Sequence, residues 1–170
     1  MIKYVRHSEI DRVKWDKTIY ASPQGEVYAV CWFLDIVSPG WDALISGDYE
    51  IVFPLTKRKK FGFQYLFQPH FTQQLGIFSL KEILPNEIEK FLLAIPRQFR
   101  LIEIQLNAGN IFSTAKGFTV ASRKTHLLDL SGEINSIRTG YSENLKRNLS
   151  DKIIFLLQLA LIYKLKCLKF

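Results

Sequence analysis

The chain has 170 residues, of which 48% are hydrophobic and 14% aromatic, enough to build one domain around a buried core and too apolar for a disordered segment. Its formal net charge of +7 is local, because Lys57-Arg58-Lys59-Lys60 supplies four of these charges and residues 151–170 supply a net of three. A basic run of this kind is typical of the solvated tip of a hairpin, so the charge argues against a nucleic-acid-binding surface.

Cysteine usage and the N-terminus indicate the compartment. Cys31 and Cys167 are far apart in unlike contexts, and neither has a partner at the spacing of a metal site or of a disulfide framework. The first residues, MIKYVRHSEIDRV, become charged within three positions and lack the apolar core of a signal peptide. We therefore expect a cytoplasmic protein that holds no metal.

The first forty residues predict one strand and two helices. The strand covers Ile2–Arg6, and Ser8 is placed to cap a helix over residues 9–20. The segment Glu26–Val37 is apolar almost all round and is followed by a Ser-Pro-Gly stop. This pattern favours a buried helix, although a short apolar run also fits a strand.

Between residues 41 and 69 the sequence predicts strands joined by tight turns. Ser46-Gly47-Asp48 separates two apolar runs and is typical of a hairpin, and Lys57–Lys60 is expected to form the next turn. Pro54 indicates an edge or a bulge, and a Gln-Pro pair ends the last strand. The expected strands are Ala43–Ile45, Tyr49–Leu55 and Phe63–Phe67.

A further helix is predicted between Pro85 and Pro96, where four apolar residues recur at the spacing i, i+3, i+4 and i+7. These residues are Ile88, Phe91, Leu92 and Ile95. The later expected elements are a half-buried strand at Leu101–Asn107, a hairpin pair at Phe118–Ala121 and Arg123–Leu130, and a helix with the apolar stripe Ile134, Ile137, Tyr141, Leu145 and Leu149. The order of elements predicts an α+β (mixed α/β) fold class with a largely antiparallel central sheet flanked by helices.

Five segments resemble one known family in the same order. They are WDALISGDYEIVFPL, KKFGFQYLFQPHFTQQLGIFS, RLIEIQLN, THLLDL and YSENLKRN, and the match is most specific over residues 41–79. Over residues 28–150 the chain resembles the N-terminal half of bacterial acyl-CoA N-acyltransferase-like proteins, in the double-domain branch of the GNAT superfamily that includes the Fem-type aminoacyl ligases. The resemblance implies a GNAT-like sheet and, in a full-length relative, transfer of an acyl or aminoacyl group to an amine.

The acyl-donor site of that family has no counterpart in the sequence. GNAT enzymes hold the coenzyme pyrophosphate on a turn of the form Arg/Gln-x-x-Gly-x-Gly/Ala at a helix N-terminus, where free N–H groups and the helix dipole stabilise the phosphate. The nearest run, Lys59–Gln64, lacks the second small residue and opens a strand. We therefore expect no cofactor in this chain, with acetyl-CoA, another acyl-CoA or an aminoacyl donor used by the second half of a full-length relative.

Residues 151–170 differ abruptly in composition from the preceding sequence. Their apolar run, Ile153–Tyr163, has eleven residues, fewer than the ~20 that span a bilayer. The change to Ile, Leu, Phe and Lys resembles out-of-frame translation. We therefore expect a truncated product, with a GNAT-like N-terminal half-domain over residues 1–150 and an aberrant apolar and basic tail over residues 151–170.

The amide-rich segment QPHFTQQ contains the candidate site residues. His70 is the candidate catalytic base, because histidine titrates near neutrality and could deprotonate an acceptor amine. The alternative is a loop histidine bonded to the backbone, since no carboxylate stands near it in the sequence. Gln68, Gln73 and Gln74 could bind a peptide-like or sugar-peptide substrate, or equally satisfy the backbone of a long connection.

Other chemically capable side chains favour a structural interpretation. His7 and His126 stand alone beside strand ends, and Asp35 and Glu103 are single acids without a paired carboxylate. The aromatic residues after the basic run recur at every second position, which favours one face of a buried strand over a stacking platform. These aromatic residues are Phe61, Phe63, Tyr65 and Phe67.

Three functional hypotheses follow. The first is the acceptor side of an amine acyltransferase of envelope biosynthesis, with an amine-bearing small molecule or a peptidoglycan precursor as acceptor. The second is a catalytically inactive orphan fragment or interaction module that self-associates through an exposed sheet edge. The third, a basic nucleic-acid-binding protein, ranks last because the charge is local. Neither a nucleic-acid partner nor a membrane span is expected.

Overall fold

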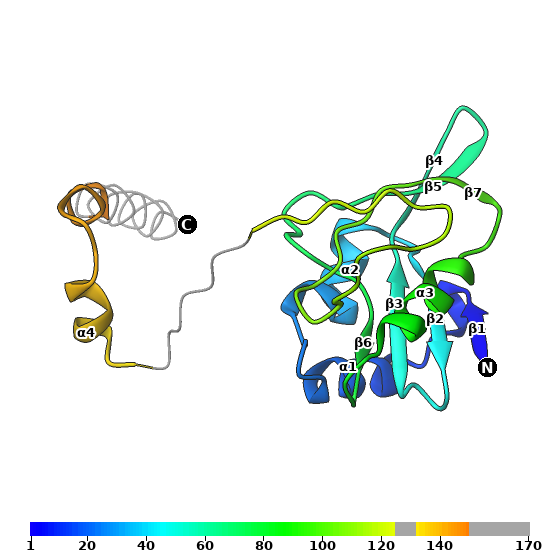
Figure 1. Cartoon of the computed structure of the whole chain (residues 1–170), viewed down its shortest axis with the longest axis horizontal. Helices are drawn as coiled ribbons and strands as arrows, with labels where there is room; N and C mark the ends of the chain where they lie inside the picture. The colour runs from blue at the N-terminus through cyan, green and yellow to red at the C-terminus, as the bar shows by residue number, and fades with distance from the viewer. Residues whose placement is uncertain (125–131, 150–170) are drawn as a thin grey trace, which may run out of the picture. The chain divides into compact units, whose positions relative to one another are not determined.

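The computed structural model describes residues 1–124 and 132–149, which belong to two compact units, Met1–Ala121 and Ser122–Phe170 (Figure 1). The first unit is a mixed α+β structure, as predicted, with helices packed against β-strands. It contains two sheets in place of the single central sheet that the sequence predicts. The predicted domain boundary at residue 150 falls at the edge of the described residues and stays a prediction.

The first sheet is antiparallel throughout and confirms the predicted hairpin. Its register places Leu44 between Tyr4 and Phe53. The turn of the hairpin contains Gly47 at φ 65° and Tyr49 at φ 66°, a left-handed conformation that glycine adopts readily and tyrosine rarely. In spatial order the strands are β1 (Ile2–Val5), β2 (Asp42–Ser46), β3 (Ile51–Leu55) and β6 (Phe78–Ser79).

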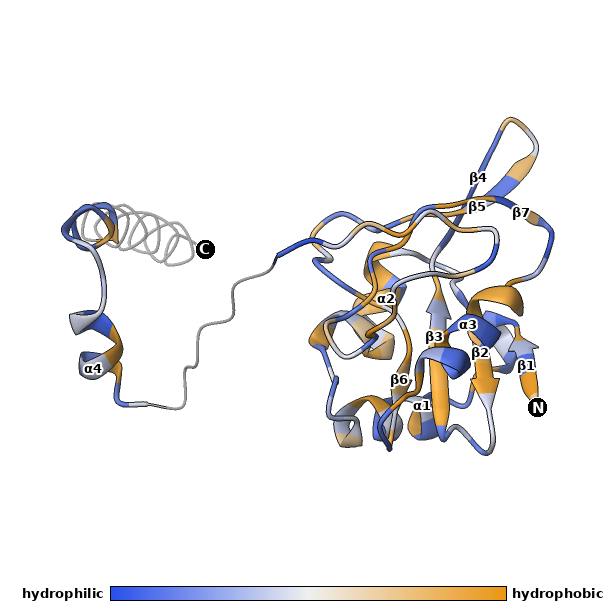
Figure 2. Ribbon diagram, viewed as in Figure 1, coloured by the Kyte–Doolittle hydropathy of each residue, from blue (hydrophilic) through white to orange (hydrophobic). Residues whose placement is uncertain are grey.

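Each face of this sheet covers its own core, because side chains alternate along a strand. Ala43 and Ile45 of β2 pack into the core that contains residues of α1 and α2, whereas Leu44 packs into the core that contains residues of α3. Figure 2 shows β2 and β3 as hydrophobic along most of their length, as expected of strands buried on both faces. The helices are α1 (Arg12–Ala21), α2 (Cys31–Val37) and α3 (Pro85–Leu93).

The boundaries of the first two helices differ from the prediction. Asp11, and not Ser8, is the N-cap of α1, because its carboxylate accepts hydrogen bonds from the second and third backbone N–H groups of the helix. The predicted helix over Glu26–Val37 is divided into a short 3₁₀ helix, η2 (Val27–Ala29), and α2. A second 3₁₀ turn, η1 (His7–Glu9), connects β1 to α1.

The structure confirms the predicted amphipathic helix α3. Its apolar positions Ile88, Phe91 and Leu92 are all buried, as their spacing requires. Pro85 occupies the first turn, and the carboxylate of Glu87 accepts a hydrogen bond from the backbone N–H of Leu84 at 3.1 Å. The N-terminus of α3 is therefore already occupied by an acidic side chain.

The second sheet contains β4 (Lys57–Lys60), β5 (Phe63–Leu66) and β7 (Phe99–Ile102), with β4 antiparallel and β7 parallel to β5. The β4–β5 hairpin extends away from the rest of the unit (Figure 1). The prediction that the basic run forms a turn is wrong, because these residues form β4. The turn is Phe61-Gly62, with φ of 49° and 81°, a two-residue connection that matches the twist of a hairpin.

Two buried amide side chains complete the hydrogen bonding of Ile77, next to β6. The backbone N–H of Ile77 donates to Oδ1 of Asn110 at 2.8 Å, and its carbonyl accepts from the Nδ2 atoms of Asn110 and Asn107 at 2.9 and 3.1 Å. The predicted strand over Leu101–Asn107 is correspondingly short. It ends with β7, and only an isolated parallel bridge at Leu106 continues it.

In the second unit, the predicted single helix is interrupted. Helix α4 (Ile134–Thr139) ends at Gly140, and a new helical segment over residues 143–149 follows Ser142. The hydroxyl of Ser142 accepts a hydrogen bond from the backbone N–H of Leu145 at 3.3 Å, which caps the new segment. Among the described residues, no helix is both long and apolar enough to cross a bilayer.

The predicted hairpin pair is not observed where the structure describes it. Residues 118–124 contain no strand, although Phe118 forms an isolated bridge with Ala115. Residues 125–130 of the second predicted strand, including His126, lie outside the described residues, as does the tail over 151–170.

Candidate functional site

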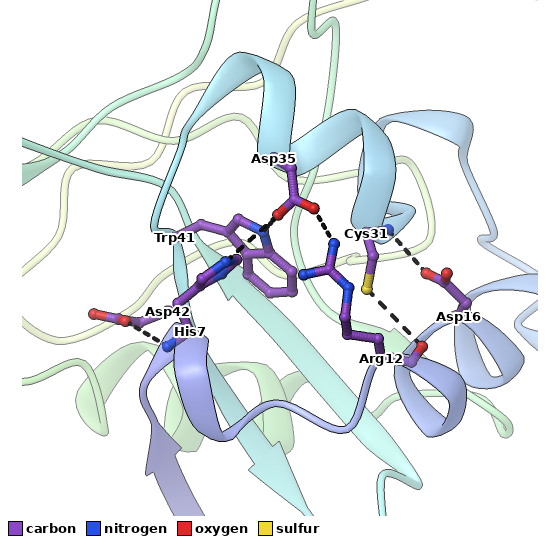
Figure 3. Close-up of polar contacts among 7 residues, drawn as sticks. All are labelled: His7, Arg12, Asp16, Cys31, Asp35, Trp41 and Asp42. Atoms are coloured by element: carbon purple, nitrogen blue, oxygen red, sulfur yellow. Dashed lines mark hydrogen bonds and ion pairs between the residues drawn. The ribbon is translucent and has the colours of Figure 1, made fainter.

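The half-buried carboxylate of Asp35, on α2, contacts the side chains of three residues, one of which is the buried Trp41 (Figure 3). Asp35 accepts a hydrogen bond from the indole Nε1 of Trp41 at 3.0 Å and forms an ion pair with the guanidinium of Arg12. The ring of His7 approaches the same carboxylate, with 3.7 Å between Nε2 and Oδ1. Trp41 also packs on Trp15, with 4.7 Å between ring centroids. The cluster therefore holds α1, α2 and the start of β2 together.

The neighbouring carboxylate, Asp42, is only 1% exposed and is fully engaged. It accepts hydrogen bonds from the Tyr4 hydroxyl at 2.5 Å and from the backbone N–H of His7 at 3.0 Å, and it forms an ion pair with Lys57. Burial, together with the hydrogen bond to Asp42, raises the pKa of Tyr4 to about 12. The phenol therefore remains a donor at neutral pH, and Gln98 Nε2 donates to its oxygen at 3.0 Å.

His7 is not the lone histidine that the sequence predicts, because the fold places Asp35 beside it. Its ring is nevertheless poorly placed for proton transfer. Nδ1 is buried and forms no hydrogen bond within the described residues, while Nε2 faces Asp35. Neither nitrogen is presented to a substrate, so this polar cluster is structural.

The thiol of Cys31 is also excluded as a reactive group. Cys31 is 2% exposed, its backbone N–H donates to Asp16 Oδ1 at 2.8 Å, and its Sγ lies 3.9 Å from the carbonyl oxygen of Arg12. Burial and then the interaction with Asp16 raise the pKa of the thiol to about 12. Since the thiolate is the nucleophile, the side chain is inert at neutral pH.

We expect Cys31 to react with Ellman's reagent at pH 8 at least about 100-fold more slowly in the folded protein than in the denatured one, because so little thiolate is present. The measurement uses a Cys167→Ser variant, so that Cys31 is the remaining thiol. Equal rates for folded and denatured protein would show that the thiol is accessible and ionised.

The structure separates two of the predicted site residues. His70 is exposed, and within the described residues no side chain bonds to its ring. Gln68 is held at both ends of its amide: Nε2 donates to the carbonyl of Thr72 at 3.0 Å, and Oε1 accepts from the backbone N–H of Gln105 at 2.9 Å. Gln68 thus satisfies the backbone of the connection, which is the alternative that the sequence left open.

Gln74 contacts a different part of the chain. Gln73 is exposed, whereas Gln74 is half-buried and its Nε2 donates to Oε1 of Glu26 at 2.7 Å. The two residues of this bond are 48 positions apart in the chain. Gln74 therefore fixes the position of a carboxylate that lines a surface pocket.

This pocket lies at the C-terminal end of α1 and has a volume of about 220 Å³. Its lining includes the carboxylate of Glu26, the rings of Tyr20 and Trp32, and Gly25. A Cβ at Gly25 would lie 2.3 Å from the carbonyl oxygen of Ile19, so the loop can approach the end of the helix only with glycine at this position.

The electrostatics of the pocket favour a cation. The last carbonyl groups of α1 carry the negative end of the helix dipole, and the last turn contains no basic residue. Glu26 has no cation within ion-pairing distance in the described parts of the chain, in contrast to Asp35 and Asp42, which pair with Arg12 and Lys57. The exposed rings of Tyr20 and Trp32 can add cation–π attraction.

A second hollow, of about 540 Å³, follows the C-terminal end of α3 and the start of β7. Arg97 and Arg100 are its charged residues, and the other lining side chains are apolar. It contains no acid or base for proton transfer. Across residues 1–124 and 132–149, no group of three or more His, Cys, Asp or Glu residues is arranged to hold a metal ion.

Sequence reasoning missed Glu26, Tyr20 and Trp32. They lie on separate elements of the chain, and neither their spacing nor their types form a motif. The sequence offers only an indirect signal for this pocket. It predicts that the glutamine-rich segment binds substrate, and one residue of that segment, Gln74, bonds to Glu26. No family model, curated protein or solved structure matches the chain.

Proposed function

We propose that this chain is the acceptor-binding half of an N-acyltransferase-like protein, and that the pocket at the end of α1 binds the protonated amine of the acceptor. The observation that carries the proposal is the half-buried carboxylate of Glu26, which Gln74 positions and which has no counter-ion among the described residues. Burying part of a carboxylate without a neighbouring cation costs free energy. An ammonium group in the pocket would offset that cost.

The resemblance of residues 41–79 to the GNAT superfamily supports the reaction class. The first sheet, which is antiparallel and has helices on both faces, supports the proposed class, whereas the separate second sheet is not what a single GNAT-like sheet implies. The sequence predicts that the glutamines of the 68–74 segment contact substrate. Of these, Gln74 lies beside the pocket, because it bonds to Glu26. His70 remains the candidate base of the same segment, and its exposed ring is open to solvent.

We expect the protein to bind N-acetyl-lysine amide more tightly than N-acetyl-norleucine amide, because the two differ only in the side-chain ammonium. The Glu26→Gln variant should lose about tenfold in affinity for the lysine compound, since the amide oxygen can still accept a hydrogen bond but no longer carries the charge that strengthens it. Chemical-shift titration of the indole N–H of Trp32 measures both affinities at the pocket itself.

The matched control is Glu82→Gln, which removes an exposed carboxylate outside the pocket and should bind as the original chain does. Equal affinity for the two compounds, or an unchanged affinity in Glu26→Gln, would contradict an amine site.

The acyl donor is expected to bind elsewhere than on this chain. At the N-terminus of α3, Pro85 lacks an N–H and Glu87 places its carboxylate where a phosphate would sit. Calorimetric titration with coenzyme A should therefore give no binding heat at micromolar ligand. Saturable heat in that range would contradict the assignment of an acceptor half and would make this chain a self-sufficient acyl-CoA enzyme.

A further inference from the structure

The outer face of the second sheet is formed by aromatic and basic side chains in alternation across its strands. In the β4–β5 register, Lys60 is opposite Phe63 and Arg58 is opposite Tyr65, so all four side chains stand on one side of the sheet. Leu66, the residue after Tyr65, points to the other side of the sheet and is fully buried in the core. We call this surface the aromatic face; its residues are Arg58, Lys60, Phe63, Tyr65, Phe67 and Arg100.

The prediction that these rings belong to the core is wrong. Phe63 is 50% exposed, and Phe61, at the tip of the hairpin, is 86% exposed. The recurrence at every second residue does identify one face of a strand, but that face is only partly covered: Tyr65 and Phe67 are half-buried, whereas Phe63 and the tip residue Phe61 are exposed. Since the argument against a stacking surface rested on burial, it no longer holds.

The cations of the face lie along the aromatic row on both sides. The guanidinium of Arg58, on β4, lies 4.1 Å from the ring centroid of Phe67, and that of Arg100, on β7, lies 4.6 Å from the ring centroid of Phe63. Such cation–π contacts keep the charged groups at the level of the rings. Tyr65 and Phe67 complete the row, with 6.2 Å between ring centroids.

These positive charges are not neutralised by the protein. Within the described residues, no carboxylate is in ion-pairing distance of Arg58, Lys60 or Arg100. The closest acid along the chain is Glu103, just beyond β7, whose backbone N–H donates to the carbonyl of Leu66. A ligand that fits this face would carry negative charges and would also present flat apolar groups.

We propose that the aromatic face binds a single-stranded nucleic acid, RNA or DNA, which runs along β5. Unpaired bases would stack on the rings and on the guanidinium planes, and the phosphates would contact the basic side chains on either side. A membrane surface is the less favoured partner, because its apolar contacts would concentrate at the tip, whereas here the cations accompany the rings along the strand. The proposal concerns a surface separate from the pocket at the end of α1 and does not depend on the function proposed for that pocket.

The test measures fluorescence anisotropy of labelled 20-nucleotide oligo(U) and oligo(dT) with the full chain, between 50 and 300 mM salt. Arg58→Ala/Arg100→Ala should weaken binding at least about tenfold at 50 mM salt and lower the slope of log affinity against log salt by about 1.4, since two phosphate contacts are lost. The charge-matched control, Lys17→Ala/Lys81→Ala, removes two exposed cations from other surfaces and should bind nearly as the original chain does.

Stacking is tested separately from charge. Phe63→Ala should weaken binding about tenfold with an unchanged salt slope. Its control is Phe71→Ala, which removes a ring that is 93% exposed and lies outside the sheet. Because the Phe63 side chain is half-exposed, its removal should preserve the circular dichroism spectrum, and this variant keeps the test decisive even where the double arginine variant does not fold.

Three outcomes would overturn the proposal. The first is the absence of oligonucleotide binding at 50 mM salt. The second is an equal loss of affinity in the two double variants, which would indicate unspecific attraction by the net charge. The third is sedimentation with phosphatidylserine-containing vesicles that depends on Phe61, without oligonucleotide binding, which would assign the hairpin to a lipid surface.

Discussion

Replacement of Asp42 by alanine is expected to lower the free energy of unfolding by about 3 kcal/mol or more, as measured by urea denaturation. Removing one partner of a buried ion pair typically costs about 3–5 kcal/mol, because the other charge is left unpaired. The side chain of Lys57 is 27% exposed and can partly regain water, which places the expected loss near the lower end. The Tyr4 hydroxyl and the backbone N–H of His7 also lose their acceptor.

The control for Asp42 is another ion-paired aspartate. Asp48 pairs with Lys14 at 2.6 Å, but its side chain is 76% exposed, and an exposed pair contributes only about 0–1 kcal/mol. Asp48→Ala should therefore change the free energy of unfolding by less than about 1 kcal/mol. Similar losses in the two variants would show that burial does not set the strength of the Asp42 network.

The second large effect is expected from Trp41→Ala, which should cost about 3–5 kcal/mol of unfolding free energy. Trp41 is fully buried, packs on Trp15, and donates its indole N–H to Asp35. The alanine variant would leave a cavity between α1, α2 and the sheet and would remove the donor from a half-buried carboxylate. Chemical denaturation followed by circular dichroism measures the loss.

Trp32→Ala is the matched control for this substitution. The indole of Trp32 is 54% exposed, so its removal should change stability by about 0.5 kcal/mol or less. A loss of stability in Trp32→Ala as large as that in Trp41→Ala would contradict the assignment of Trp41 to the core and of Trp32 to the surface.

The elements that could be predicted from sequence are those in which periodicity and turn chemistry agree. The hairpin around Gly47 and helix α3 between Pro85 and Pro96 both have clear boundaries and a hydrophobic pattern of the correct period. The predicted N-terminus of α1 lies three residues before the observed one, because Ser8 and Asp11 are both good N-cap residues and only the tertiary structure decides between them.

The errors in the second sheet have a different physical origin. Four consecutive basic residues show no alternation of hydrophobicity, so β4 could not be distinguished from a turn. The real turn begins with Phe61 at φ 49°, a conformation that is uncommon for a residue with a bulky side chain. The period of two in the following aromatic residues identifies a face of a strand, but the pattern does not state whether another element covers that face.

Of the residues at the candidate site, the sequence predicts only Gln74, which bonds to a lining residue but does not itself line the pocket. Of the glutamines in the 68–74 segment, Gln74 bonds to Glu26, which lines the pocket at the end of α1, while Gln68 is bonded to backbone. The pocket itself depends on a contact between residues 48 positions apart and on the close approach of Gly25 to the end of α1. Contacts of this kind follow from tertiary packing and leave no local pattern in the sequence.

The two asparagines that bond to Ile77 determine how much of the chain this fold needs. Their side chains bond to the backbone of Ile77 as the backbone of a neighbouring strand would, although both residues come from a segment without regular secondary structure. A shortened version that stops soon after Ile102 would retain every strand of the described residues and yet leave the peptide group of Ile77 buried without these hydrogen-bond partners. The minimal self-sufficient folding unit must therefore extend at least to Asn110, so dissection experiments should place their cuts beyond that residue.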